Sequence, residues 1–417
     1  MIYLRSILFY IVIIDFSLFP MFHAFGLPYK PGLLIVGIAA LFKWYRKPCR
    51  LLFFYFFGLI LACWIGATYQ QFFFPTQSIN FTIYCTSSYL LGFIGFCFGY
   101  YYAPKNIDKV LSIALVLILM NLVIGAFWDK LPFLVEFYSL QFRLEDDYLS
   151  RRNTGIFTNP NISALITNLF LLFILLANNF NMFTKNRIIY IFVLWVMALV
   201  ALLTLFSKNQ LVFFTILSFF HLRQIMSFSL KKQIIGFLVL IVVSLGVYSL
   251  SFKHFSDFQP FRNGLHVFAH LPSEIHNNYF KPELDISKMG DRRVKYILAA
   301  KAFYYSPIWG SGFDRAETGI FSKETKISYH SDWSFIFVAG GIIAGLFLFL
   351  IIYEAWKIHP LLVLPFFLPG LTNSFMLTAQ LFCLYGIFWG VLKRGRVTGE
   401  ICEKSGYKAG IVSGGRQ

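Results

Sequence analysis

Long runs of consecutive apolar residues, separated by short polar segments, are the feature that most limits how this sequence can fold. A helix of about 20 apolar residues crosses the hydrocarbon core of a bilayer. Hydrophobic residues make up 58% of the 417-residue chain, whereas charged residues make up only 13%. A soluble fold needs more charge to cover its surface, so lipid must be the solvent for most of this chain. We therefore predict an all-α polytopic membrane protein.

The apolar runs predict about twelve transmembrane helices. The first run is long, lacks a small-residue cleavage site before Pro28 and is followed by many more runs, so we expect a retained helix rather than a signal peptide. The predicted spans are 2–22, 31–44, 51–68, 82–102, 110–128, 162–179, 188–206, 211–226, 234–251, 333–353, 360–371 and 374–392.

Basic residues lie in alternate connections between these runs, and they predict the orientation of the chain. They are Lys43, Arg46, Lys47, Arg50, Lys105, Lys109, Lys185, Arg187, Arg223, Lys231 and Lys232, followed by Lys393, Arg394 and Arg396 after the last run. Lys and Arg in short connections stay on the cytoplasmic side, so we expect both termini to be cytoplasmic. The net charge of +17 then reflects topology, and no nucleic-acid partner is expected.

Two long polar stretches, 129–161 and 252–332, fall on the non-cytoplasmic side in this topology. The second predicts a large, partly helical periplasmic loop between spans 9 and 10, with an amphipathic helix from Arg292 to Tyr305. The predicted regions are 1–251 with the first nine helices, 252–332 as the loop subdomain, 333–392 with the last three helices, and 393–417 as a basic cytoplasmic tail.

Ionisable and amide side chains gather at the predicted outer membrane face. They are Arg152, Asn159 and Asn161 before the sixth span, Lys208 in a short turn between the seventh and eighth, Arg292 and Arg293 at the start of the loop helix, and His330 and Asp332 before the tenth. Guanidinium and ammonium groups bind phosphate oxygens, and a helix N-terminus attracts anions. These residues therefore predict a site for a diphosphate-linked lipid, although cations near helix ends also extend to the interface without any further role.

Other polar residues could form sites of a different kind. His266 and His270 have the spacing of two zinc ligands, with His276 nearby. The glutamate of the HExxH pattern is missing, and no carboxylate is evident as a third ligand, so no metal site is expected. Asp15, inside the first apolar run, is either functional or a polar contact between helices. The sequence contains no Walker loop and no GxSxG motif.

Four segments carry a family resemblance. They are Arg152 to Gly155 with Asn159-Pro160-Asn161, the Ser207-Lys208 turn, Gly290-Asp291-Arg292 with its helix and the following Ser306-Pro307 to Gly310-Ser311-Gly312, and His330 before Gly340-Gly341. In this order they resemble the superfamily of O-antigen polymerases and O-antigen ligases, bacterial envelope glycosyltransferases, over about residues 140–350. Two positions depart from that pattern, because the family commonly has Arg at Lys208 and Asn at Ser331.

The resemblance implies an enzyme of the bacterial inner membrane that works without a metal or other cofactor on the periplasmic face. Its donor is an undecaprenyl-diphosphate-linked oligosaccharide, and its acceptor is a growing glycan or lipid A–core. Arg152, Lys208, Arg292 and Arg293 are implied to neutralise the diphosphate, with Asn159 and Asn161 beside them. His330 is implied to take the acceptor proton, with Asp332 holding its tautomer. A chain-length regulator and a flippase are possible partners.

The leading interpretation is a polymerase that extends O-antigen, capsule or exopolysaccharide, and a ligase that transfers the finished glycan to lipid A–core is the alternative. From a different class, a flippase for lipid-linked oligosaccharides would also be polytopic and basic. It should show repeat-related halves and cations along the centre of the bundle. The asymmetric spans and the single large late loop favour an enzyme. Tyr279, Tyr305 and Trp309 either stack on sugar rings or form the core of the loop.

Overall fold

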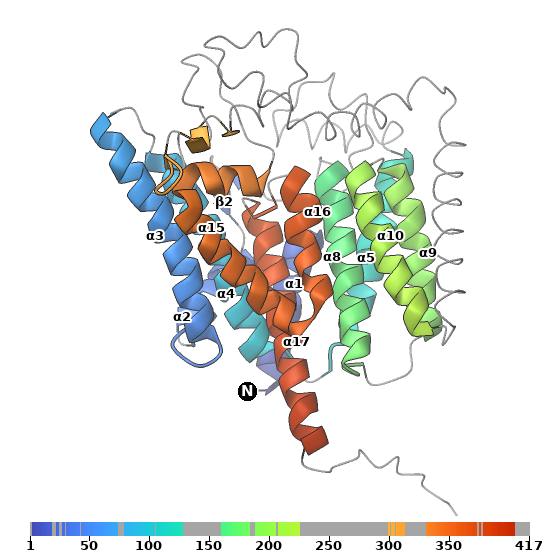
Figure 1. Ribbon diagram of the computed structural model, residues 1–417. Helices are drawn as coiled ribbons and strands as arrows, with labels where there is room; N and C mark the ends of the chain where they lie inside the picture. Colours follow the sequence, from blue (N-terminus) through green and yellow to red (C-terminus); the bar gives the residue numbers. More distant parts are fainter. Residues whose placement is uncertain are drawn as a thin grey trace, which may run out of the picture.

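The computed structural model of this chain is built mainly from α-helices that run between two ends of one bundle (Figure 1). The structure describes residues 2–18, 22–24, 27–29, 31–41, 43–73, 79–104, 106–127, 160–183, 188–205, 207–225, 299–300, 302–304, 306–312, 331–372, 375–376 and 378–404. The helices of the N-terminal part are α1 (Ile2–Leu18), α2 (Pro31–Leu41), α3 (Cys49–Phe73), α4 (Ile79–Tyr102) and α5 (Lys109–Phe127). Those that follow are α8 (Pro160–Asn179), α9 (Ile188–Thr204), α10 (Lys208–Ile225), α15 (Asp332–Ile358), the 3₁₀ helix η4 (Pro360–Val363), α16 (Leu364–Thr372) and α17 (Ala379–Lys404).

The helical membrane class predicted from the sequence is confirmed. Among the residues that the structure describes, four helical segments are long and apolar enough to cross a bilayer, namely Cys49–Tyr69, Thr82–Tyr102, Asn161–Asn179 and Asp332–Ile358. Large apolar side chains on these helices face outward, including Phe54 on α3 and Leu346 on α15, which are 52% and 58% exposed. Such exposure suits lipid and not water. Twelve spans remain a prediction, and the expected span at 234–251 lies outside the described residues.

Several helix boundaries differ from the prediction. The first helix ends at Leu18, and β1 (Phe22–Ala24) and β2 (Leu27–Tyr29) then form a short antiparallel hairpin. Helix α2 has 11 residues, or roughly 17 Å at 1.5 Å per residue, which is too short to cross a bilayer. The expected span at 360–371 is divided into η4 and α16, each of which contains a proline.

Glycines bring the N-terminal and C-terminal parts of the chain into close contact. Gly95 and Gly99 on α4 face the backbone carbonyls of Cys383 and Ile387 on α17, and Gly386 on α17 faces the carbonyl of Gly92. A Cβ atom at any of these three positions would collide with the facing carbonyl oxygen. Small residues allow such close backbone approach between membrane helices. Helix α17 is thereby packed along α4.

Asp15 makes a polar contact between two helices. Its Oδ2 accepts a hydrogen bond from the backbone N–H of Gly32, in the first turn of α2, at 2.8 Å. The first N–H groups of a helix have no partner within the helix, and a carboxylate near them is stabilising. The contact between α1 and α2 accounts for a carboxylate within an apolar run.

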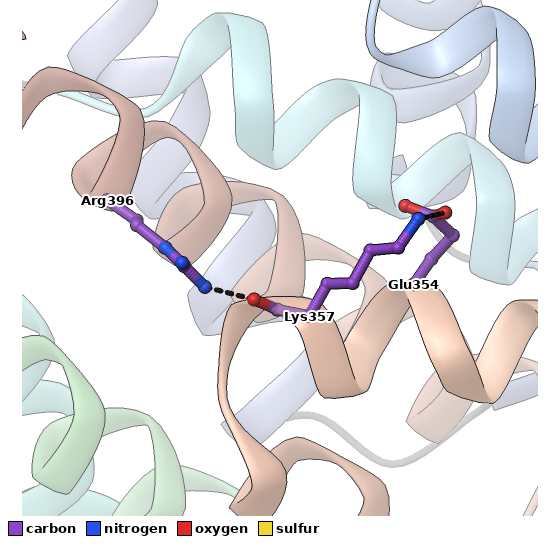
Figure 2. A network of polar contacts seen from close by, with 3 residues as sticks. All are labelled: Glu354, Lys357 and Arg396. Atoms are coloured by element: carbon purple, nitrogen blue, oxygen red, sulfur yellow. Dashed lines mark hydrogen bonds and ion pairs between the residues drawn. The ribbon is translucent and has the colours of Figure 1, made fainter. Parts of the chain in front are cut away.

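Arginines of α17 cap other helices at one end of the bundle. The Arg394 Nη1 donates to the carbonyl of Ala103, just after α4, at 2.6 Å. The Arg396 Nη1 donates to the carbonyl of Lys357 near the end of α15 (Figure 2), and also to that of Ile358. Helix α17 continues past these two arginines to Lys404, through positions that were predicted to form a tail. We call the end of the bundle at which Arg394 and Arg396 lie the basic end.

His359 connects α15 to η4 at the same basic end. Its Nδ1 accepts a hydrogen bond from the Leu361 N–H at 3.2 Å, a role that requires an unprotonated nitrogen. Burial, together with the positive charge of Arg396, lowers the pKa of His359. The imidazole therefore stays neutral at pH 7 and caps the 3₁₀ helix.

We expect the change Arg394→Ala to lower the free energy of unfolding by about 1–2 kcal/mol, because it removes a charge-assisted hydrogen bond to the Ala103 carbonyl. Lys393→Ala is the matched control, since it removes the same charge one residue away. Denaturant unfolding in detergent micelles measures both variants. Equal decreases in the free energy of unfolding of the two variants would show that the positive charge, and not the hydrogen bond to Ala103, stabilises the fold.

Candidate functional site

Several helices begin at the end of the bundle opposite to the basic end, and three of them carry residues of the predicted site. Helices α8, α10 and α15 start at Pro160, Lys208 and Asp332 and run toward the basic end (Figure 1). Phe180, directly after α8, contacts His359, directly after α15, with ring centroids 6.5 Å apart, so these two helices end together. Each helix N-terminus carries about half a positive charge from its backbone dipoles. We call the end of the bundle at which α8, α10 and α15 begin the outer end.

A hydrogen bond joins the starts of α8 and α10. The Ser207 Oγ, one residue before α10, donates to the Asn161 Oδ1 in the first turn of α8 at 2.7 Å. Two segments that the sequence analysis singled out, 46 positions apart in the chain, are thus adjacent. The expected tight turn at Lys208 is instead the first turn of α10, which places Lys208 at the N-terminus of a helix.

Amide side chains extend this contact between α8 and α10 into the bundle. The Asn168 Nδ2 donates to the backbone carbonyl of Gln210 at 2.8 Å and to the Gln210 Oε1 at 3.1 Å. On the other side of α8, the Asn121 Nδ2 of α5 donates to the Thr167 Oγ1 at 3.3 Å. All four side chains are buried. None of the four was among the predicted site residues, although an amide within an apolar run is itself a signal of a polar contact or a site.

Three consecutive side chains hydrogen-bond the start of α15 to α16 and to the segment before α17. The Ser331 Oγ donates to the Gly370 carbonyl at 3.2 Å, the Asp332 Oδ2 accepts from the Met376 N–H at 2.8 Å, and the Trp333 Nε1 donates to the Phe366 carbonyl at 2.8 Å. The Ser331 Oγ also accepts from the Ser334 N–H and so caps α15. Serine and asparagine are both good N-caps, so the departure at Ser331 keeps this cap.

Helix α15 is broken at Gly341, where residues 306–312 pack against it. Gly341 has φ 64° and ψ −157°, a conformation open essentially only to glycine. The N–H groups of Ser311 and Gly312 donate to the carbonyls of Val338 and Ala339 at 2.7 and 2.8 Å, and the Ile342 N–H donates to the Pro307 carbonyl at 2.8 Å. The first part of α15 consequently lies across the outer end before the helix turns along the bundle (Figure 1).

Helix α16 connects these parts, because it contacts both α10 and α15. The paired starts of α8 and α10 and the fastened start of α15 therefore belong to one region of the outer end. Asp332, at the start of α15, is 2% exposed, so its carboxylate is held inside this region and away from solvent. The arrangement combines positive helix ends, neutral amides and one buried carboxylate. Helix N-termini attract anions and amides bind neutral polar groups, whereas a carboxylate disfavours an anion next to it.

Only part of the predicted site can be placed. Arg152, Asn159, Arg292, Arg293 and His330 lie outside the described residues, as do Tyr279 and Tyr305 and the histidines at 266, 270 and 276. Trp309 is 43% exposed, so it is not part of a loop core. Of the expected amphipathic face, Ala302 is buried. In the part of the chain that the structure describes, no group of three or more His, Cys, Asp or Glu could hold a metal ion.

Comparison of the chain with protein-family models gives no match, and a search of curated proteins gives none either.

Proposed function

We propose that this protein is a membrane glycosyltransferase that polymerises surface polysaccharide from an undecaprenyl-diphosphate-linked donor, at the periplasmic face of a bacterial inner membrane. The observation that carries the proposal is the hydrogen bond between Ser207 and Asn161, which joins the N-termini of α8 and α10 at the end opposite to the basic end. Basic residues of membrane proteins collect on the cytoplasmic side, so the outer end is proposed to be periplasmic.

The proposed reaction transfers a glycan between two oxygens. The acceptor hydroxyl oxygen attacks the anomeric carbon of the donor, the bond from that carbon to the phosphate oxygen breaks, and the lipid diphosphate leaves with the electron pair. His330 receives the acceptor proton. The N-termini of α8 and α10 and the cations Lys208, Arg152, Arg292 and Arg293 stabilise the charge that develops on the leaving diphosphate. No metal or other cofactor is required in this scheme.

A transfer assay on the purified protein in lipid nanodiscs tests the proposal directly. With a lipid-linked oligosaccharide as donor, we expect longer glycans on the carrier, and His330→Ala should lower the rate about 100-fold because it removes a general base. His23→Ala, in the hairpin after α1, is the control histidine. A His330→Ala variant that retains full transfer activity would contradict this role, and a wild-type protein without any transfer activity is the result expected of a flippase.

The glycans of a deletion strain separate polymerase from ligase. A lipid A–core that carries one repeat unit indicates a missing polymerase. A bare core with accumulated lipid-linked polymer indicates a missing ligase that acts on lipid A–core. An unchanged envelope would contradict both functions.

A further inference from the structure

The amide pair between α8 and α10 leaves one donor and one acceptor unused. The Asn168 Oδ1 and the Gln210 Nε2 are buried, and neither has a hydrogen-bond partner among the residues that the structure describes. Exchanging the oxygen and nitrogen of Asn168 would not help, because an oxygen would then face the Gln210 carbonyl and the Gln210 Oε1. The unused donor and acceptor therefore follow from the geometry of the pair.

Burying polar atoms without partners carries a free-energy penalty. Both side chains are 0% exposed, so the closed contact between α8 and α10 bears that penalty in full. Separation of the two helices at their outer ends would let a polar ligand pair with both atoms. The penalty of the closed state thus favours uptake of a group that carries one acceptor and one donor.

The position of the pair indicates which part of a donor substrate it would meet. Gln210 lies in the first turn of α10, two residues after Lys208, and Asn168 lies two turns into α8 from Asn161. The hydrogen-bonding groups of the pair are neutral amides, which suit a sugar better than a phosphate. In a sugar linked to a diphosphate, the 2-substituent of the first sugar lies next to the phosphates.

We propose that Asn168 and Gln210 form a subsite for the first sugar of the lipid-linked donor. The Gln210 Nε2 donates to the carbonyl of a 2-acetamido group, and the Asn168 Oδ1 accepts from its N–H. A 2-hydroxyl group can replace the acetamido group, because its one oxygen can accept from the Gln210 Nε2 and donate to the Asn168 Oδ1. This inference rests on the proposed function, and it assigns selectivity for the first sugar to two buried amides within the bundle.

Binding of two lipids to the full-length protein in nanodiscs tests the subsite. The probes are undecaprenyl diphosphate and undecaprenyl diphosphate that carries a single 2-acetamido sugar. The wild-type protein should bind the sugar-bearing lipid about tenfold more tightly, as two added hydrogen bonds allow. Asn168→Leu and Gln210→Met replace each amide by an apolar side chain of similar volume. They should bring the ratio of the two affinities near one and leave the affinity for the bare lipid unchanged. Asn121→Leu, at the contact between α5 and α8, should keep the tenfold ratio.

A lipid with a 2-deoxy sugar repeats the test on an unaltered protein, so the result does not depend on how well the variants fold. It should bind the wild-type protein no better than the bare lipid. Equal binding of the three lipids by the wild-type protein, or a tenfold ratio retained in Asn168→Leu and Gln210→Met, would overturn the subsite and leave the proposed function intact. Failure to bind any of them would contradict the proposed function itself.

Discussion

Replacing Gly341 with alanine should remove most of the folded protein from the membrane. Gly341 has φ 64° and ψ −157°, which residues with a Cβ atom essentially do not adopt. A Cβ atom there would also collide with the Ile308 carbonyl and lie 2.7 Å from the carbonyl oxygen of Pro307. Relief of the backbone strain or of the collision separates residues 306–312 from α15. We therefore expect the free energy of unfolding to fall by about 3–5 kcal/mol, from backbone strain and lost hydrogen bonds.

Gly37→Ala provides a matched control for this prediction. Gly37 lies within α2, and no neighbouring atom is within 4 Å of a Cβ atom built on it. Alanine is the better helix former by about 1 kcal/mol, so Gly37→Ala should fold as well as the wild type or better. The amount of monodisperse protein extracted from membranes, and its unfolding temperature, measure both variants. A Gly341→Ala variant as stable as the wild type would show that the break is not required.

The broken helix shows which part of this fold hydropathy can predict. The apolar run at 333–353 predicts a helix, and α15 covers it. The break at Gly341 depends on a partner segment about 30 residues earlier in the chain, which satisfies the freed carbonyls of Val338 and Ala339. A hydropathy average over a span carries no information about such a partner. The sequence contained both motifs, but it could not show that they bond to each other.

Interactions between distant segments also explain the other differences. The apolar signal ends near residue 392, yet α17 continues, and its Arg394 and Arg396 donate to carbonyls just after α4 and at the end of α15. Asn168 was overlooked because one amide hardly changes the mean hydropathy of α8. Conversely, the start of α8, predicted at residue 162 and observed at Pro160, depends on a local signal, a polar segment followed by a long apolar run.

Asp332 should be the most sensitive described residue for the transfer reaction. The change Asp332→Ala leaves the Met376 N–H buried without its acceptor and releases the start of α15. We expect a loss of about 1–3 kcal/mol in stability. Transfer should fall about 100-fold, because a shift of roughly 1 Å in a reacting group can have that effect. His330 is two residues before Asp332, so the displacement would reach the proposed base directly.

Asp332→Asn separates anchoring from an electrostatic role. Asparagine keeps an oxygen that can accept from the Met376 N–H, so stability should return to that of the wild type. If anchoring is the role of Asp332, transfer returns as well and its pH profile is unchanged. If the carboxylate instead holds the tautomer of His330, the Asp332→Asn variant folds normally, transfers slowly and shows a displaced pH profile. We expect the first result, because the Asp332 Oδ2 accepts from the backbone N–H of Met376. Asp108→Asn, one residue before α5, controls for the loss of one negative charge.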